Sequence, residues 1–252
     1  MLYAFLLTVL AGLSTLLGSL IIFFIKKPRQ CYLNIAMGFA AGVMIFVALT
    51  ELLVESIEGL GYPGAMLSFF FGIGLIILLD TFIPHTYEAE ISCECKDFRQ
   101  MKDGRLARCG LLIALGVAIH NLPEGVAVFF SSLADQRLGL TLAIAIALHN
   151  IPEGIAIAMP IYYASRSRKK AFWWSFLSGI TEPLAALAAF LVFGSFISER
   201  LLGAIIGAVA GVMVFISFDE LLPFAYKQEK DNLTILGIFS GMAVMAVSLM
   251  VV

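Results

Sequence analysis

The chain has 252 residues, of which 61% are hydrophobic and only 13% are charged, and its formal net charge is −2. A soluble domain carries roughly 25% charged residues, so this composition excludes a water-soluble globular protein. The absence of a basic stripe gives no indication of nucleic-acid binding. We therefore expect the chain to lie in the lipid bilayer and not to bind nucleic acid.

Eight apolar segments are long enough to cross a bilayer, which takes about 20 mostly apolar residues. In chain order the predicted spans cover residues 2–25, 34–55, 62–83, 109–133, 138–163, 171–197, 201–224 and 232–252. The first is as long as a full span and is interpreted as a retained span, not as a signal peptide. The runs lack the alternation of barrel strands, so we expect an all-α membrane protein with eight transmembrane helices. Because only the connection at about 84–108 is of any size, residues 1–252 are expected to form one transmembrane domain.

The basic residues divide unevenly between the two sides of these spans. All 16 Lys and Arg except Arg137 and Arg200 fall in the first, third, fifth and seventh connections. Since cytoplasmic loops carry the excess of Lys and Arg, we predict that these four loops are cytoplasmic and that both termini are extracytoplasmic. The four cysteines then face a reducing compartment, where disulfides are rare.

Two internal repeats are visible. Residues 38–53 (GFAAGVMIFVALTELL) match residues 207–222 (GAVAGVMVFISFDELL), and HNLPEG at 120–125 matches HNIPEG at 149–154. By the span count the members of each pair run in opposite directions, as in secondary transporters that hold their substrate between inverted repeats. Helix packing through small residues is an alternative explanation of the glycines. It does not explain the matching glutamates at 51 and 220.

The ionisable side chains inside the predicted spans are acidic groups and imidazoles. They are Glu51, His120, Glu124, His149, Glu153, Glu182, Asp219 and Glu220. Ionisable residues are costly inside a membrane and are usually functional, and no Lys or Arg lies mid-span to neutralise these carboxylates. Either protons or cations must do so, and we interpret the group as a cation site.

Each hexapeptide holds a histidine and, four residues later, a glutamate, and residues at that spacing project from one face of a helix. The asparagine after each histidine, Asn121 or Asn150, lies close to the same face. Imidazole with carboxylate and amide oxygen suits Zn, Fe, Mn, Co or Cd, and affinity alone does not choose among them. A buried histidine is more often a satisfied core residue, but that interpretation does not explain two matching histidine–glutamate pairs.

Some further residues have two interpretations. Met44 in the second span is either a ligand or, more commonly for methionine, a packing residue. Asp219 is either a site residue or an interface residue near the end of its span. In the third connection, His85 and the C-x-C at 93–95 either collect metal at the exit or form a solvated loop with reduced thiols.

The two hexapeptides, together with Glu182-Pro183, resemble the signatures of the ZIP (Zrt/Irt-like) family of metal transporters. The repeated HNxPEG form resembles the prokaryotic broad-range zinc-uptake branch of that family, and the resemblance covers nearly the whole chain. It implies a 3+2+3 helix bundle, in which spans 1–3 and 6–8 are related by inverted pseudo-symmetry around spans 4 and 5.

The resemblance also implies a metal centre near the middle of the membrane that holds one or two ions. By motif position, the ligands implied for a first metal are His120, Glu124, His149 and Glu153, with Met44 nearby. Those implied around a second metal are Asn121, Asn150, Glu124, Glu153 and Glu182. Some relatives carry an acidic residue in place of Asn150, so the second site is expected to be less charged in this chain.

These features predict a transporter that imports zinc into the cytoplasm, with iron, manganese, cobalt or cadmium as alternative substrates. An inside-negative potential favours the entry of a divalent ion by about 4–5 kcal/mol per 100 mV, and no P-loop is present to use ATP. The metal is then a substrate, and we expect neither a cofactor nor an enzymatic activity. The expected exit for the ion runs past Glu51, Asp219 or His85.

Two other functional classes are open at this point. A membrane metalloenzyme is disfavoured because H-E-x-x-H is absent and three histidines are too few for a His-box oxidase. An exporter or a metal-gated sensor uses the same ligand types, and only the direction of flux separates it from an importer. The residues also leave open whether the chain forms a homodimer, whether protons are coupled to transport, and whether it is a carrier or a channel.

Overall fold

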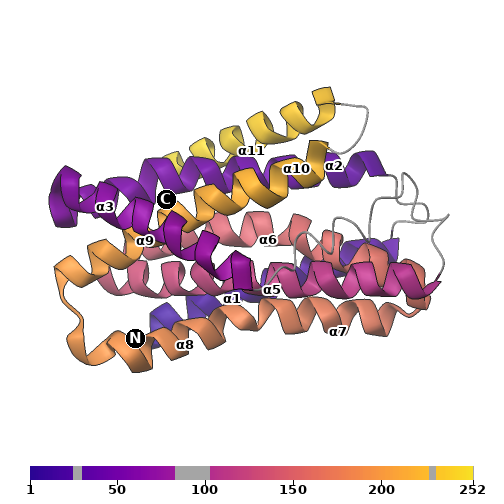
Figure 1. The fold of residues 1–252 in the computed structure, drawn as a ribbon, viewed down its shortest axis with the longest axis horizontal. Coiled ribbons are helices and arrows are strands. Elements are labelled where there is room, and N and C mark those ends of the chain that lie inside the picture. Colours follow the sequence, from indigo (N-terminus) through magenta and orange to yellow (C-terminus); the bar gives the residue numbers. More distant parts are fainter. Residues whose placement is uncertain (25–29, 83–102, 227–230, 252) are drawn as a thin grey trace.

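The computed structural model describes residues 1–24, 30–82, 103–226 and 231–251, and every regular element in these ranges is helical. The α-helices are α1 (Leu2–Phe24), α2 (Gln30–Val47), α3 (Leu53–Phe82), α5 (Asp103–Ala134), α6 (Gln136–Ser165), α7 (Arg168–Gly179), α8 (Thr181–Phe193), α9 (Glu199–Ile216), α10 (Leu222–Tyr226) and α11 (Asp231–Val251). Two π-helical turns, η1 (Ala48–Leu52) and η4 (Ser217–Leu221), and a short 3₁₀ turn, η3 (Gly194–Phe196), join some of them. Figure 1 shows the helices lying along one another in an elongated bundle.

Six segments among the described residues are long and apolar enough to cross a membrane. They are Leu2–Ile21, Asn34–Leu79, Gln136–Met159, Arg168–Phe196, Glu199–Leu221 and Asn232–Met250. The predicted all-α membrane fold is therefore confirmed, whereas the count of eight spans stays a prediction. Two of the expected spans lie together in the 46-residue segment Asn34–Leu79, and the expected span at 109–133, which falls in α5, is not among the six.

The 46-residue segment turns back on itself at Gly61. This residue has φ 72° and ψ 162° inside α3, a conformation that glycine alone adopts readily. Ser56 and Ser68, which a straight helix would hold about 18 Å apart, both lie against Gly207 of α9. The chain therefore reverses at Gly61, and α3 consists of two helical arms.

Helices from the two halves of the chain pack in pairs. α2 packs against α11 and α3 against α9, while α1 packs against α6 and α5 packs against α7 and α8. Gly38 and Gly42 lie against the backbone of α11 at Thr234 and Ile238, where any side chain would collide with that helix. The glycines of the longer repeat are therefore packing positions, in agreement with the alternative explanation that small residues let helices pack closely.

The two ends of the bundle differ in what they carry (Figure 1). Both termini lie at one end, where α5 is joined to α6 and α8 is joined to α9. The connection from α6 to α7 lies at the other end and carries Arg166, Arg168, Lys169 and Lys170. Both hexapeptides lie in the interior of their helices, between these ends.

Candidate metal centre

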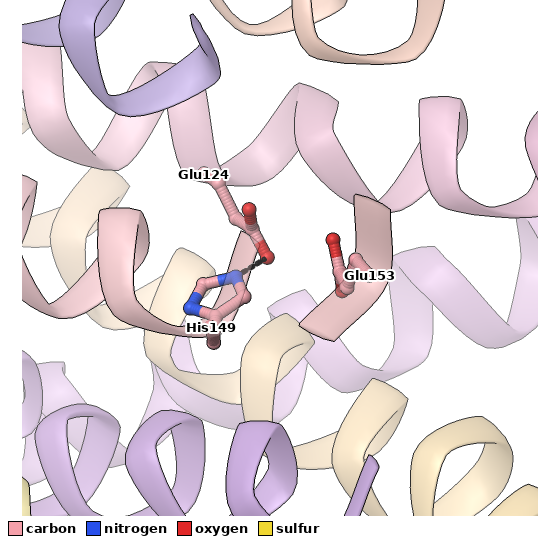
Figure 2. Close-up of side chains that lie close together, drawn as sticks. All are labelled: Glu124, His149 and Glu153. Carbon is pink, nitrogen blue, oxygen red and sulfur yellow. Dashed lines mark hydrogen bonds and ion pairs between the residues drawn. The ribbon is translucent and has the colours of Figure 1, made fainter. Parts of the chain in front are cut away.

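Three buried side chains from α5 and α6 come together in the interior of the bundle. Glu124 of α5 and His149 and Glu153 of α6 are fully buried, and one ligand atom from each lies within 4.8 Å of the other two. The Nε2 atom of His149 is 2.9 Å from Oε1 of Glu124. In Figure 2 the imidazole and the Glu124 carboxylate face each other, with the Glu153 carboxylate beside them. Two carboxylates and an imidazole at this spacing are a donor set suited to zinc and related divalent metals.

The secondary structure explains why these three meet. His149 and Glu153 are one helical turn apart on α6 and share a face, and α5 packs along that face to present Glu124. Buried carboxylates are costly unless they are paired or hydrogen-bonded. The second oxygen of Glu124, Oε2, is buried and has no hydrogen-bond partner among the described residues. A bound cation would satisfy that oxygen.

The two hexapeptide asparagines tie the neighbouring helices to this centre through their amide nitrogens. Nδ2 of Asn121 donates to the carbonyl of Ser178 at 3.1 Å, and Nδ2 of Asn150 donates to the carbonyl of Ala11 at 3.0 Å. Asn150 also donates to Oε1 of Glu182. Both amide oxygens are buried without a hydrogen-bond partner among the described residues, which leaves them available as neutral ligands.

Glu182 enters the centre at a break between two helices. α7 ends at Gly179, and Pro183 lacks the N–H that would continue the helix by bonding to the Gly179 carbonyl. Glu182 is fully buried, and its Oε2 has no hydrogen-bond partner in the described part of the chain. Gly125, the last residue of the first hexapeptide, lies directly against the Glu182 backbone. This glycine therefore lets α5 and α8 approach closely enough for Glu182 to join the centre.

The structure does not bring the remaining acidic candidates to this centre. Glu51 lies in η1 and interacts electrostatically with Arg137 in the first turn of α6, about 18 Å along that helix from His149. Glu220 lies in η4 and is half-buried, and Asp219 beside it is exposed.

The placement of Glu51 bears on the expected exit path. The hydroxyl of Ser56, one turn beyond η1, donates to the carbonyl of Gly203 at 2.8 Å, near the start of α9. Glu220 follows the end of α9, so the two glutamates lie at opposite ends of the bundle. At most one of the alternatives Glu51 and Asp219 can therefore lie on the exit path. The physical reason is that α2 and α9 are antiparallel, so matched positions of the repeat lie at opposite ends.

The other candidates are placed as follows. Met44 is fully buried within the apolar core, in the same cluster as Met213. His120 lies on α5 one turn before Glu124, but its side chain is outside the described part of the structure. His85 and the cysteines at 93 and 95 also lie outside the described residues.

The sequence analysis missed the contribution of α1. Residues 10–17 (LAGLSTLL) match residues 177–184 (LSGITEPL), which lie across the junction of α7 and α8. The signal that would have revealed this third repeat was the adjacent polar pair Ser14-Thr15, two residues after Gly12 in a mostly apolar span. Thr15 is fully buried, and its position matches that of Glu182.

Comparison with known proteins shows that the whole chain matches one family. A family model described as ZIP Zinc transporter matches residues 1–249. A relative from Chlorobium phaeovibrioides, named Zinc transporter ZupT, is 51% identical over 257 residues, which cover 98% of this chain and 97% of the relative. Relatives with the same name from Oceanobacillus iheyensis and Clostridium perfringens are 48% and 44% identical, and each match covers 99% of this chain and at least 95% of the relative.

Proposed function

Because the chain belongs to the ZIP zinc transporter family, we propose that it imports zinc into the cytoplasm through the centre that α5, α6 and α8 form. Membership of this family makes it a multi-pass cell-membrane transporter and not an enzyme, so the metal is its substrate and not a cofactor. The relatives named for zinc transport support zinc as the principal ion. Iron, manganese, cobalt and cadmium are further substrates that the donor set accommodates.

One observation carries the proposal: Glu124, His149 and Glu153 form a buried cluster of metal-binding side chains in the interior of the bundle. We propose that the first ion is bound by His120, Glu124, His149 and Glu153. We propose that a second ion is bound by Asn121, Asn150, Glu124, Glu153 and Glu182. The hydrogen bond from Asn150 to Glu182 and the two available amide oxygens support this second set.

We propose the 3+2+3 arrangement of eight spans for the whole chain. The reversal at Gly61 supports counting the 46-residue segment as two spans, and α5 supplies another. In this arrangement span 2 (α2) corresponds to span 7 (α9), and span 8 (α11) corresponds to span 3 (α3). The observed contact of α2 with α11 therefore corresponds to the observed contact of α9 with α3. In the same way, the contact of α1 with α6 corresponds to the contact of α5 with α7 and α8. Inverted repeats produce such a correspondence.

The proposed direction rests on charge. The end of the bundle that holds the α6–α7 connection carries Arg and Lys, and we assign this end to the cytoplasm. Both termini lie at the opposite end and are therefore extracytoplasmic. The potential then drives a divalent cation inward with about 4–5 kcal/mol per 100 mV.

The test is uptake of radioactive zinc by proteoliposomes with an imposed inside-negative potential. We expect saturable uptake by the wild type and none by Glu124→Gln with Glu153→Gln. The matched control is Glu199→Gln, an exposed carboxylate at the start of α9, which is expected to transport normally. A wild type that binds zinc tightly but moves none under this potential would overturn the transport proposal and indicate a sensor.

A further inference from the structure

The two halves of the centre are held by matching hydrogen bonds. Asn150 of the second hexapeptide donates to the carbonyl of Ala11 in α1, and Asn121 of the first donates to the carbonyl of Ser178 in α7. Ala11 and Ser178 are matching residues in the repeat formed by residues 10–17 and 177–184. The contact between α1 and α6 and the contact between α7 and α5 are therefore made by equivalent hydrogen bonds.

The neighbouring hydroxyls make equivalent hydrogen bonds to the same two carbonyls. Ser14 donates to the Ala11 carbonyl at 2.6 Å, and Thr181, which occupies the matching position, donates to the Ser178 carbonyl. Each of these carbonyls thus accepts a hydroxyl from its own segment and an amide from a hexapeptide. This agreement fixes the register of the repeat residue by residue.

The hexapeptide glycines extend the match to Thr15. Gly125 lies against the backbone of Glu182, and Gly154 lies against the carbonyl of Thr15. Both contacts are so close that a methyl group on either glycine would overlap the neighbouring backbone. Thr15 therefore occupies, in the first half of the centre, the place that Glu182 occupies in the second.

The side chains of Thr15 and Glu182 both lie beside the crossing of α1 and α7. α1 and α7 cross where Gly12 and Gly179 pack against each other's carbonyl oxygens. The hydroxyl oxygen of Thr15 is 3.3 Å from where a Cβ of Gly179 would lie, and Cδ of Glu182 is 3.3 Å from where a Cβ of Gly12 would lie. The hydroxyl and the carboxyl thus flank one glycine crossing.

The hydroxyl of Thr15 is buried and has no hydrogen-bond partner among the described residues. A helical threonine usually donates to the carbonyl four residues earlier, as Thr8 does on the same helix at 2.9 Å. For Thr15 that carbonyl belongs to Ala11, which already accepts from Ser14 and Asn150. The centre has therefore taken up the usual acceptor of Thr15 and left its hydroxyl available.

We propose that Thr15 is a further residue of the metal centre, whose hydroxyl oxygen is a neutral ligand for the transported divalent cation at the position that mirrors Glu182. The inference rests on the proposed function. With Glu124, Glu153 and Glu182 ionised, the centre carries three negative charges, and a fourth carboxylate in place of Thr15 would increase the attraction for the ion. Ligand charge sets how tightly such sites hold their metal. A neutral oxygen at this position allows the ion to bind and still leave.

The experiment compares four variants by zinc uptake in proteoliposomes and by equilibrium dialysis of zinc with the purified protein. Thr15→Val keeps the shape but removes the hydroxyl, and we expect it to raise both KM and Kd about fivefold. Thr15→Ser keeps the hydroxyl, and we expect values within about twofold of the wild type. Thr15→Asp adds a charge and is expected to lower Kd about tenfold and to slow the maximal rate.

Thr8→Val is the matched control, because Thr8 is equally buried on α1 but already has a hydrogen-bond partner. We expect it to leave KM and Kd unchanged. If Thr15→Val behaves as the wild type while Thr15→Ser is impaired, Thr15 packs and does not bind metal, and the inference is overturned while zinc transport by the wild type still stands. The Val and Ser variants decide the matter even if Thr15→Asp fails to fold. A wild type that transports no zinc would overturn the proposed function and this inference together.

Discussion

The half of the metal centre built from α1 and α6 and the half built from α5, α7 and α8 share a framework but differ in chemistry. In both halves an asparagine donates to a helix carbonyl, and a glycine lies against the backbone one turn later. Where one half has Thr15 in a continuous α1, the other has Glu182 beside a break that Pro183 causes. The packing contacts are thus common to both halves, whereas the additional carboxylate, Glu182, belongs to one of them.

Contacts that position the helices can thus be distinguished from groups that are proposed to bind the ion. The glycine contacts and the hydrogen bonds from Nδ2 of Asn121 and Asn150 fix how closely the helices approach, and they need no metal. Oε2 of Glu124, Oε2 of Glu182 and the hydroxyl of Thr15 are buried without a hydrogen-bond partner among the described residues, and a cation would satisfy them. Loss of a positioning contact should lower stability, whereas loss of a proposed ligand atom should lower metal affinity.

The largest effect is expected from breaking the shared framework. Gly125→Ala and Gly154→Ala each place a methyl group inside a neighbouring backbone, so a whole helix must shift. We expect each to destabilise the folded protein by about 3 kcal/mol and to abolish uptake, as measured by thermal unfolding in detergent and by zinc flux. Gly74→Ala is the control, because Gly74 has open space around it and alanine is the better helix former. Equal stability of all three variants would show that the close contacts do not exist.

The next effect comes from removing the charge that distinguishes the halves. Glu182→Gln keeps an oxygen to accept from Asn150 but loses the carboxylate charge. We expect the zinc Kd to rise about tenfold with little change in thermal stability. Equilibrium dialysis measures this change, and an unaltered Kd would remove Glu182 from the proposed ligand set.

Transfer of the charge to the other half sharpens the comparison. Thr15→Asp in the Glu182→Gln background restores the number of carboxylates at the mirrored position. We expect the zinc Kd of the double variant to return to within about threefold of the wild type. A double variant whose zinc Kd stays as high as that of Glu182→Gln alone would contradict the equivalence of the two positions.

A smaller loss is expected from one positioning bond. Asn121→Ala removes the hydrogen bond to the Ser178 carbonyl, which is buried between α5 and α7. The expected cost is about 1 kcal/mol of stability, read from thermal unfolding. Ser240→Ala, which removes a half-buried hydroxyl bonded within α11 and away from the centre, should cost less. A larger loss in α11 than at Asn121 would argue against the positioning role.

The smallest effect is expected at the end of the bundle. Glu51 is half-buried near Arg137 and far from the centre, so Glu51→Gln acts on ion capture through the local field only. We expect KM to change by about threefold or less and the zinc Kd of the purified protein to stay constant. A change in Kd as large as that of Glu182→Gln would place Glu51 in the binding site.

The sequence predicted which side chains lie together where its signal was polar, and their binding of metal stays a prediction. Two identical histidine–glutamate pairs in apolar surroundings have a strong physical reason to lie together, and Glu124, His149 and Glu153 do so. It also predicted the all-α membrane fold, because backbone in lipid must satisfy its own hydrogen bonds. The reversal at Gly61 follows from a φ that favours glycine, although the printed residues alone do not reveal that angle.

The sequence predicted less where the signal was weak or relative. The role of α1 was missed because Gly12 and Thr15 are small and uncharged, so they resemble ordinary packing residues. The expected exit named both Glu51 and Asp219, although matched residues on antiparallel helices lie at opposite ends of the bundle. Both points concern how helices face one another, and that information lies in contacts between distant segments.

The measurement that tests the central claim most directly is X-ray absorption at the zinc edge of the purified, zinc-loaded protein. The account predicts a shell of nitrogen and oxygen ligands at about 2.0–2.1 Å with imidazole scattering. That scattering should diminish in His149→Ala, and the bound zinc should fall in Glu124→Gln with Glu153→Gln. A sulfur shell at about 2.3 Å, or a spectrum that these substitutions leave unchanged, would place the ion elsewhere and contradict the account.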